Sequence, residues 1–419
     1  MQHPFLLDVQ RHGSLSAASF RMGRLEVQSR LVQLIAAHGG IGRADIARIT
    51  GMARSTVSEH VQPMLERALL SEQPARYAGR GRPSIGLSLN ASAGVVLVAD
   101  IDMTQVRLVV TDLARQKLAE DAFAPHIAAG PERLLGEIVT RFRALLGSTP
   151  RTARIRALVV GLASPVDFER GVPVRPPMMP GWDGFPIADW LRERLSMPVL
   201  LDNDVNLMAL GEARSRPLDG SPLLFVKVGS GIGCGIVTKE CELHRGADGD
   251  AGDIGHIRVA AGAGVMCMCG NVGCIEAIAS VTAIVAQMRA QQMPAQQAPD
   301  EPVSPAVDID LPALLVSGDA LAVRLVRTAA AEIGEVVATL VNMYNPASIV
   351  LGGRLAHLSD DLLSGVRAAV YRRAPPLATR RLSIENSRLG GDAGLFGGIA
   401  LGVDKALSPT GVQELLEQR

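Results

Sequence analysis

Three cysteines and one histidine lie close together past the middle of the chain. The segment Gly252-Asp253-Ile254-Gly255-His256 precedes Cys267-Met268-Cys269-Gly270-Asn271-Val272-Gly273-Cys274-Ile275-Glu276. One imidazole and three thiolates form the ligand set of a closed, tetrahedral zinc site of the structural kind. Gly270 and Gly273 allow the tight turns that such a loop needs. The alternative is a group of small buried side chains, because free cysteine packs well in a core.

We favour the metal site because three of the five cysteines fall within this short segment. The predicted ligands of a structural Zn²⁺ ion are His256, Cys267, Cys269 and Cys274. Thiols grouped for a metal, with no disulfide framework, also favour a reducing cytoplasm. No secretory signal pattern or membrane-spanning apolar run is found, so we expect no membrane partner.

The N-terminal part of the chain is basic and has helical periodicity. Residues 1–90 hold 11 Arg and no Lys against 6 acidic residues, whereas the whole chain has a formal net charge of zero. Helices are expected over residues 25–37, 43–49 and about 53–69, and residues 73–89 suggest a hairpin or wing. Two short helices joined by a turn with Gly51 form the pattern of a helix-turn-helix. An ordinary helical hairpin remains the alternative.

In a helix-turn-helix, the first residues of the second helix face base edges in the major groove. Val57 and Val61 are expected to pack inward, and Ala53 is a poor helix cap. The segment Arg80-Gly81-Arg82-Pro83 suits insertion into a narrow minor groove, unless it is only a solvated linker. The predicted DNA-binding residues are Arg54, Ser55, Thr56, Ser58, Glu59, Arg80 and Arg82.

From Gly94 onward, short apolar strands alternate with helices, which indicates an α/β architecture. Strands are expected at 95–98, 106–110, 157–160, 223–228 and 349–351, and helices at 187–195, 206–215 and 321–344. Residues 289–311 are rich in Gln, Pro and Ala, as a surface insertion would be. A length of 419 residues favours more than one domain. We expect a head over residues 1–90 and a body over residues 91–419, with the metal site at 256–274.

The body resembles the ROK family of repressors, open reading frames and sugar kinases. The resemblance rests on residues 252–276, 201–212, 228–235 and 345–353, and it covers about residues 90–405. It implies an actin-like, hexokinase-type (ribonuclease H-like) pair of α/β lobes with a cleft between them. Family repressors carry a helix-turn-helix in front of this body, whereas the family's kinases lack one.

The resemblance also implies a sugar site. The implied sugar-binding residues are Asn203, Asp204, Asp253, His256 and Glu276, with Asp204 in the position of the kinase base. One ring nitrogen of His256 would bind the metal while the other reaches the sugar. Asp253 stands where the family usually has Glu, which is one methylene longer and affects which sugar fits.

The first phosphate loop departs from the family pattern. The kinases carry Asp-x-Gly-Gly-Thr there, whereas this chain has Asp100-Ile101-Asp102-Met103-Thr104. A carboxylate would repel a triphosphate, and a thioether would fill its space. The alternatives are a shifted loop or an Asp102 that helps to hold Mg²⁺. The glycines at 229–235 are a weak phosphate signal on their own. We therefore expect no kinase activity, with Asp204 as a vestigial base.

Together these features predict a DNA-binding transcriptional regulator, most simply a repressor, whose operator affinity changes when a sugar or sugar derivative binds. The alternative is an active, ATP-dependent sugar kinase with a DNA-binding head, and a body that only oligomerises is a third possibility. The expected partners are a double-stranded operator and a carbohydrate effector. The resemblance implies a homodimer or homotetramer, which matches a two-fold operator.

Overall fold

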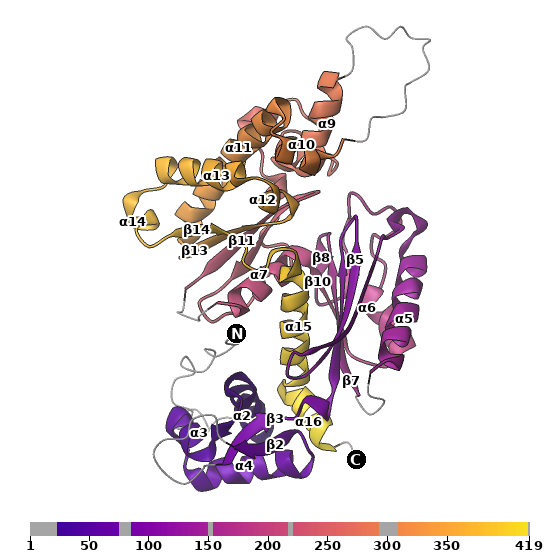
Figure 1. Cartoon of the computed structure of the whole chain (residues 1–419), viewed down its shortest axis with the longest axis vertical. Helices are drawn as coiled ribbons and strands as arrows, with labels where there is room; N and C mark the ends of the chain where they lie inside the picture. The colour runs from indigo at the N-terminus through magenta and orange to yellow at the C-terminus, as the bar shows by residue number, and fades with distance from the viewer. Residues whose placement is uncertain (1–22, 75–84, 150–153, 217–220, 293–308, 418–419) are drawn as a thin grey trace. The chain divides into compact units, whose positions relative to one another are not determined.

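The computed structural model describes residues 23–74, 85–149, 154–216, 221–292 and 309–417. These residues form two compact units (Figure 1). Unit 1 takes its described residues from Met1–Gly220 and Gly394–Arg419, and unit 2 takes its residues from Ser221–Ala393. The C-terminal residues of the chain thus return to the unit that holds the N-terminal ones. No helix in the described ranges is long and apolar enough to cross a membrane.

The described part of the head, residues 24–74 and 85–89, belongs to unit 1. Its helices are α2 (Arg24–His38), α3 (Arg43–Thr50) and α4 (Arg54–Glu66). Its strands β1 (Ile41–Gly42), β2 (Leu70–Pro74) and β3 (Ile85–Leu89) form an antiparallel sheet in the order β1-β3-β2. Three helices and a small antiparallel sheet agree with the winged helix-turn-helix head expected from the sequence, in which α3 and α4 are the helix pair.

The turn between α3 and α4 forms where the sequence predicts it. Gly51 ends α3 with φ +71°, a left-handed conformation that glycine adopts easily. The predicted end of the next helix is wrong, because α4 stops at Glu66 rather than near Leu69. Ala68 has φ +52°, and its carbonyl accepts a hydrogen bond of 2.7 Å from the Asn90 side chain. This non-glycine turn directs Leu70 into β2.

The main sheet of unit 1 has five strands in the order β10-β7-β4-β5-β6. They are β4 (Val95–Ile101), β5 (Val106–Asp112), β6 (Lys117–Phe123), β7 (Ile155–Leu162) and β10 (Val199–Asn203), beside a small pair, β8 (Val166–Asp167) and β9 (Val172–Pro173). β4, β7 and β10 run parallel. The helices of this unit are α5 (Pro131–Gly147), α6 (Ile187–Leu195), α7 (Asp204–Arg214), α15 (Ala393–Ala406) and α16 (Pro409–Glu417).

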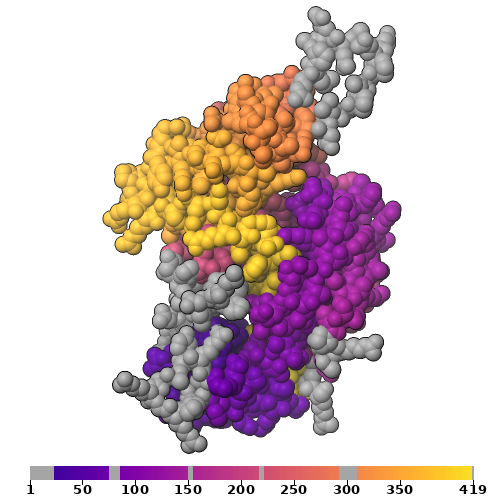
Figure 2. Space-filling model, in the orientation of Figure 1, coloured from indigo at the N-terminus to yellow at the C-terminus, as the bar shows by residue number. Residues whose placement is uncertain are grey.

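Strand β4 separates two hydrophobic cores, because successive side chains of a strand point to opposite faces. Val95, Leu97 and Ala99 pack with residues of α5 and α6. Val96 and Val98 instead belong to a core that includes α15, α16 and the buried face of the head. In the space-filling view, the indigo surface of the head continues into the purple surface of the rest of unit 1 (Figure 2). Head and sheet therefore share one core.

Unit 2 is a four-stranded sheet, in the order β12-β11-β13-β14, packed with helices in a single core. Its strands are β11 (Leu223–Val228), β12 (Ile232–Val237), β13 (Ser348–Gly352) and β14 (Ser383–Asn386). Its helices are α8 (Glu276–Ala279), α9 (Val281–Gln292), α10 (Leu311–Ser317), α11 (Ala320–Tyr344), α12 (Arg354–Leu358), α13 (Asp360–Arg373) and α14 (Pro376–Thr379). Helix α9 extends into the predicted surface insertion, whose residues 293–308 lie outside the described residues.

Candidate functional site

The thiol segment of unit 2 folds into a compact loop. The amide of Cys267 donates to the Asn271 carbonyl at 2.8 Å, and the amide of Gly270 donates to the Cys267 carbonyl at 3.0 Å. Gly270 has φ +92°, which a residue with a side chain adopts only under strain. Cys274 pairs with Arg258 across an isolated β-bridge. These backbone contacts, together with the predicted glycine turn, bring the three thiols to the side of His256.

The four predicted ligands converge on one point. One donor atom each from His256, Cys267, Cys269 and Cys274 lies within 4.8 Å of the others. The Cys269 and Cys274 sulfurs are 3.7 Å apart, and the Cys267 sulfur is 3.7 Å from Nδ1 of His256. A tetrahedral ion with metal–sulfur bonds of about 2.3 Å requires sulfur–sulfur distances of roughly 3.8 Å. The cluster therefore fits a four-coordinate metal ion.

Two of the three cluster thiols, Cys267 and Cys274, resist ionisation, whereas for Cys269 hydrogen bonds outweigh burial and lower the pKa. Burial, followed by hydrogen bonding to the neighbouring thiols, raises the pKa of Cys274 to about 12. Burial also raises the pKa of Cys267. A bound cation reverses this preference, because it stabilises the thiolate directly. The same side chains are thus neutral without a metal and anionic with one, so metal binding releases protons.

The second ring nitrogen of His256 faces the Asp253 carboxylate. Its Nε2 lies 3.8 Å from Asp253, so the two ring nitrogens point to different partners. Burial, and then the nearby Asp250 and Glu276, raise the pKa of Asp253, while His256 partly offsets them. Glu276 accepts a 2.9 Å hydrogen bond from the Ile232 amide at the β11–β12 turn. Asp253, His256 and Glu276 thus gather in unit 2 around a polar surface with both donors and acceptors.

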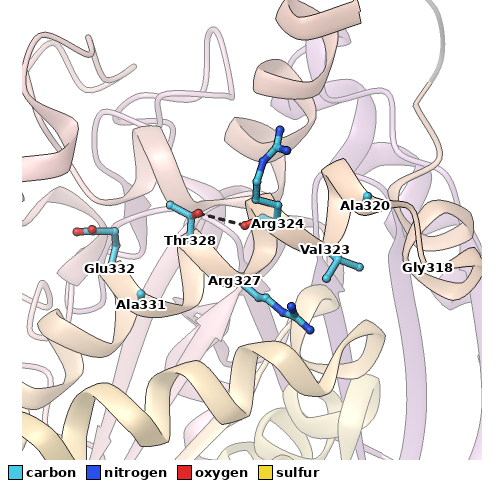
Figure 3. A pocket seen from close by; sticks show the side chains of 8 residues that line it. All are labelled: Gly318, Ala320, Val323, Arg324, Arg327, Thr328, Ala331 and Glu332. Atoms are coloured by element: carbon cyan, nitrogen blue, oxygen red, sulfur yellow. Dashed lines mark hydrogen bonds between the residues drawn. The ribbon is translucent and has the colours of Figure 1, made fainter.

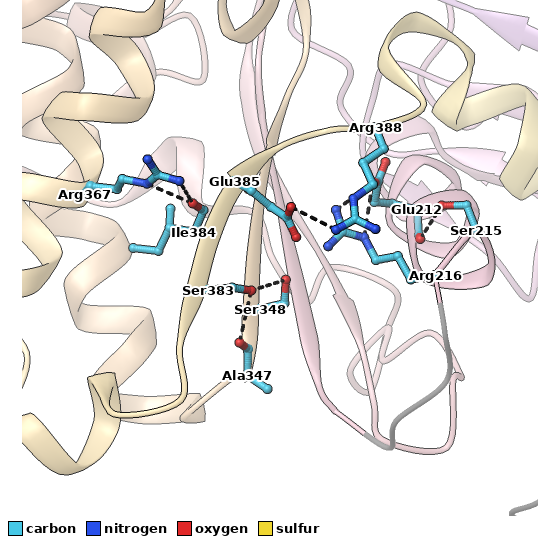
Figure 4. Close-up of polar contacts among 10 residues, drawn as sticks. All are labelled: Glu212, Ser215, Arg216, Ala347, Ser348, Arg367, Ser383, Ile384, Glu385 and Arg388. Carbon is cyan, nitrogen blue, oxygen red and sulfur yellow. Dashed lines mark hydrogen bonds and ion pairs between the residues drawn. The ribbon is translucent and has the colours of Figure 1, made fainter. Parts of the chain in front are cut away.

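The two predicted sugar residues of unit 1 lie at the turn from β10 into α7. Asn203 caps α7 by accepting from the Val205 amide at 2.9 Å, and its side-chain amide donates to the Ser164 carbonyl at 2.8 Å. Asp204 is the first residue of α7 and is buried. Both residues therefore have a local role in the fold in addition to any contact with a ligand. At the other end of α7, the fully buried Glu212 accepts from Arg216 at 2.7 Å (Figure 4).

The turn between β4 and β5 is closed by its own side chains. The Asp102 carboxylate accepts from the amide of Thr104 at 3.2 Å and from its hydroxyl at 3.3 Å. Met103 is half-buried against the core of unit 1. Asp100 faces Arg107 in the antiparallel register, and the two form an ion pair of 2.6 Å in which the Asp100 side chain is 12% exposed. Sequence reasoning missed Arg107, although the hairpin register was a usable signal.

The predicted DNA-reading residues lie on the first two turns of α4. Arg54, Ser55, Ser58 and Glu59 are exposed, and Thr56 is half-buried. Val57 and Val61 are fully buried, as predicted. Ala53 precedes the helix without a side-chain cap, which also agrees with the prediction. Arg80 and Arg82 lie outside the described residues.

Two surface pockets contain none of the predicted site residues. One, of about 610 Å³, runs along α11 in unit 2, where the Thr328 hydroxyl donates to the Arg324 carbonyl (Figure 3). Arg327, which also lines it, pairs with Asp361. Another, of about 460 Å³, lies in unit 1 beside Arg156, Lys405 and Glu414.

Comparison with known proteins gives a consistent result. The model of the ROK family matches residues 96–405. The chain is 28% identical over 385 residues to a putative xylose repressor of Caldicellulosiruptor sp., covering 90% of this chain and 95% of that protein. It is 28% identical over 375 residues to the DNA-binding transcriptional repressor Mlc of Escherichia coli, covering 88% of this chain and 90% of Mlc.

A glucokinase of Halalkalibacterium halodurans is 34% identical over 235 residues, which cover 52% of this chain and 67% of the kinase. Among solved structures, a ROK family transcriptional regulator described as a homolog of the E. coli MLC protein superposes with a TM-score of 0.78. That match has 22% sequence identity and covers 94% of this chain and 99% of the other, so it shows the fold. The repressors thus match over the head as well as the body, whereas the kinase matches over a shorter region.

Proposed function

The chain belongs to the ROK family, and we propose that it is a sugar-responsive, DNA-binding transcriptional repressor. One observation carries this proposal: similarity to named repressors covers 88–90% of the chain, so it includes part of the helical head as well as the ROK body. In this proposal, residues 1–90 bind DNA and residues 91–419 sense the effector. The cytoplasm, where DNA is present and thiols stay reduced, is the matching compartment.

DNA recognition is assigned to α4 and the basic arm. Arg54, Ser55, Thr56, Ser58 and Glu59 would read base edges or bind phosphates, because the start of the second helix enters the major groove. Arg80 and Arg82 would enter the adjacent minor groove. A homodimer or homotetramer would place two such heads on a two-fold operator.

We assign Zn²⁺ to the cluster of His256 and three cysteines. Three thiolates and one imidazole in tetrahedral positions favour zinc over the hard ions that prefer oxygen ligands. With all four positions taken by side chains, the ion has no open site for chemistry, so its role is structural. Holding Nδ1 of His256 would fix the ring and leave Nε2 for a sugar hydroxyl.

We assign sugar binding to Asn203 and Asp204 of unit 1 and to Asp253, His256 and Glu276 of unit 2. Carboxylates accept from hydroxyl groups, and the imidazole and amide donate to them, which suits a ligand with many hydroxyls. The names of the relatives make D-xylose a natural first candidate. The ligand alters operator affinity only to the extent that it binds two forms of the protein unequally.

Phosphoryl transfer is not part of this proposal. The Thr104 amide already donates to Asp102, and Asp100 already pairs with Arg107. A nucleotide would have to displace both contacts and approach two carboxylates. The second candidate is an active sugar kinase, which the glucokinase similarity and the position of Asp204 at the start of α7 favour. Sustained ATP consumption with a hexose or amino sugar that disappears in Asp204→Asn would establish it.

Operator binding is the decisive test. We expect tight binding of the purified full-length protein to its own promoter region, measured by fluorescence anisotropy, with affinity that falls steeply with salt. Arg54→Ala should weaken binding, whereas Arg192→Ala should not, since Arg192 is an exposed arginine of α6 paired with Asp189. Equal affinity for the promoter and for unrelated DNA would refute sequence-specific repression.

A further inference from the structure

We propose that helix α15 couples the sugar-side helix α7 to the head, through a buried hydrogen bond between Ser29 and the carbonyl of Leu407. The inference rests on the proposed function, since it explains how sugar binding at the start of α7 would change the position of the DNA-binding head. All of its parts lie within unit 1. In Figure 1, α15 is a yellow rod with α16 at its lower end, beside the head. Its 14 residues span about 21 Å at 1.5 Å per residue.

The start of α15 is in backbone contact with α7. A Cβ atom on Gly397 would overlap the carbonyl oxygen of Leu207 and would lie 3.0 Å from the amide nitrogen of Gly211. Only a hydrogen atom fits there, so the backbones of the two helices are in direct contact at Gly397. Further along, Asp404 of α15 pairs with Arg214 of α7 at 3.0 Å. The two helices are thus joined in the middle of α7, at Leu207 and Gly211, and at its C-terminal residue Arg214.

The same helix is fixed to the sheet. A Cβ on Gly398 would overlap the Val98 side chain, and a Cβ on Gly402 would overlap that of Val96. Both valines lie on the β4 face that shares its core with the head. A close-packed interior transmits displacement rather than absorbing it. Movement of α7 would therefore be passed to α15 as a whole.

The far end of α15 is joined to the head by polar contacts. The Ser29 hydroxyl donates to the Leu407 carbonyl at 2.6 Å, and the Gln33 side chain donates to the same oxygen at 3.4 Å. Ser29 is 3% exposed. A buried hydroxyl without a partner is unfavourable, so this contact specifies one seating of α2 against the end of α15.

Helix α16 completes the joint. Val412 and Leu415 are buried in the same core as Leu31 and Ile35 of α2. The seating of α2 therefore depends on the C-terminal helices, and α2 packs with α4 in one core. Asp204, assigned to the sugar, begins α7, so a ligand that shifts α7 would act on the head along α15. Contact between helices does not by itself demonstrate such coupling. It is demonstrated when two substitutions at different contacts have non-additive effects.

The test is a double-mutant cycle in the full-length protein. Asp404→Asn loosens the joint between α7 and α15, Ser29→Ala removes the joint to the head, and the third variant carries both changes. The readout is hydrogen–deuterium exchange of peptides from α2. We expect each single change to speed exchange, and the double variant to match Ser29→Ala alone. Gln33→Ala is the milder variant if Ser29→Ala folds poorly.

Ser148→Ala is the matched control, because Ser148 also donates to a carbonyl at 2.6 Å, at the end of α5. It should leave exchange in α2 unchanged. Additive effects in the cycle, or no effect of Asp404→Asn on α2, would overturn the proposal. Exchange is measured without sugar, so this arm gives a result even if the protein senses no sugar.

The second arm measures operator affinity with and without D-xylose, D-glucose and N-acetyl-D-glucosamine. In the wild type, we expect the effective sugar to change operator affinity by about 5- to 150-fold, which is the usual range of such coupling. In Ser29→Ala, we expect the change to fall below about threefold, with sugar affinity by calorimetry unaltered. A full sugar response in Ser29→Ala contradicts the inference, whereas no response in the wild type contradicts the proposed sugar sensing.

Discussion

The turn after β4 and the thiol loop are two short polar segments that use their polar atoms in opposite ways. In the turn, Asp102 bonds to Thr104 and Asp100 pairs with Arg107, so the carboxylates already have partners within the hairpin. In the thiol loop, four donor atoms lie within 4.8 Å of one another. At that spacing, the one imidazole and three thiol donors form a ligand set for a single cation.

The difference shows what separates a stabilised turn from a ligand site. Polar groups that pair with one another stabilise the fold and gain nothing from a ligand. In the thiol loop, burial and the neighbouring thiols raise the pKa of Cys274, so this side chain favours the neutral form until a cation stabilises its thiolate. Four substitutions test this contrast, from the largest expected effect to the smallest.

Cys267→Ala should abolish stoichiometric metal binding. We expect the free energy of unfolding of unit 2 to fall by more than about 3 kcal/mol, because metal binding is coupled to the folding of the loop. Cys241→Ala is the control, since Cys241 is equally buried but lies outside the cluster. Atomic emission measures the bound metal in each variant, and urea unfolding measures the free energy of unfolding. Full metal content in Cys267→Ala would remove this residue from the ligand set.

Arg107→Ala should lower the free energy of unfolding by about 2 kcal/mol, because it leaves the largely buried Asp100 carboxylate without its cation. Removing Asp100 as well should restore much of that loss. Arg192→Ala breaks an exposed ion pair and should change stability by less than about 1 kcal/mol. Chemical denaturation measures all three. If Arg107→Ala proves as mild as the control, the pair does not stabilise the turn.

Gly270→Ala should lower the free energy of unfolding by about 1–2 kcal/mol, because alanine is strained at a left-handed φ of +92°. Gly147→Ala at the end of α5 is the matched control. An added Cβ meets no atom within 4 Å at either position, but only Gly270 has a positive φ. Gly147→Ala should therefore be neutral or slightly stabilising. Thermal unfolding of both variants measures this difference. Equal effects of Gly270→Ala and Gly147→Ala would show that the positive φ of Gly270 is not the cause.

Asp253→Asn should stabilise the protein at pH 7 by about 0.5 kcal/mol, a small effect because the group is partly exposed. Burial raises the folded-state pKa of Asp253 above its ordinary 3.8. The wild type therefore loses stability as the pH rises from the ordinary pKa of Asp253 to its higher folded-state pKa, whereas the variant has no carboxyl group to ionise and does not. Urea midpoints should differ at pH 7 and converge as pH falls toward 3.8. If the variant is less stable than the wild type at pH 7, the ionised Asp253 stabilises the folded state and the prediction is wrong.

Local patterns predicted much of this molecule. The bounds of α6 and β11 and the turn at Gly51 follow from apolar periodicity and glycine, and the ligand cluster follows from closely spaced cysteines. The end of α4 was predicted wrongly because Ala68 turns the chain without glycine or proline. Nothing in the local pattern marks Ala68 as a left-handed residue.

Long-range contacts were the main omission. Ser29 and Leu407 are 378 residues apart, and neither lies in a distinctive motif. The Asp100–Arg107 pair was accessible from hairpin register, yet only the structure drew attention to it. The roles of Asn203, Asp204, Asp253 and Glu276 in sugar binding stay predictions.

The shared face of β4 has a practical consequence for anyone who grafts this DNA reader onto another sensor. A graft that ends after Leu89 would expose Leu31 and Ile35 to solvent. Val412 and Leu415, which pack in the same core, belong to the C-terminal part of the chain and would be lost. A chimera that keeps its solubility would need to import both chain ends together. Exchange of such readers between relatives during evolution would meet the same constraint, because recombination would have to bring in two separated pieces of gene.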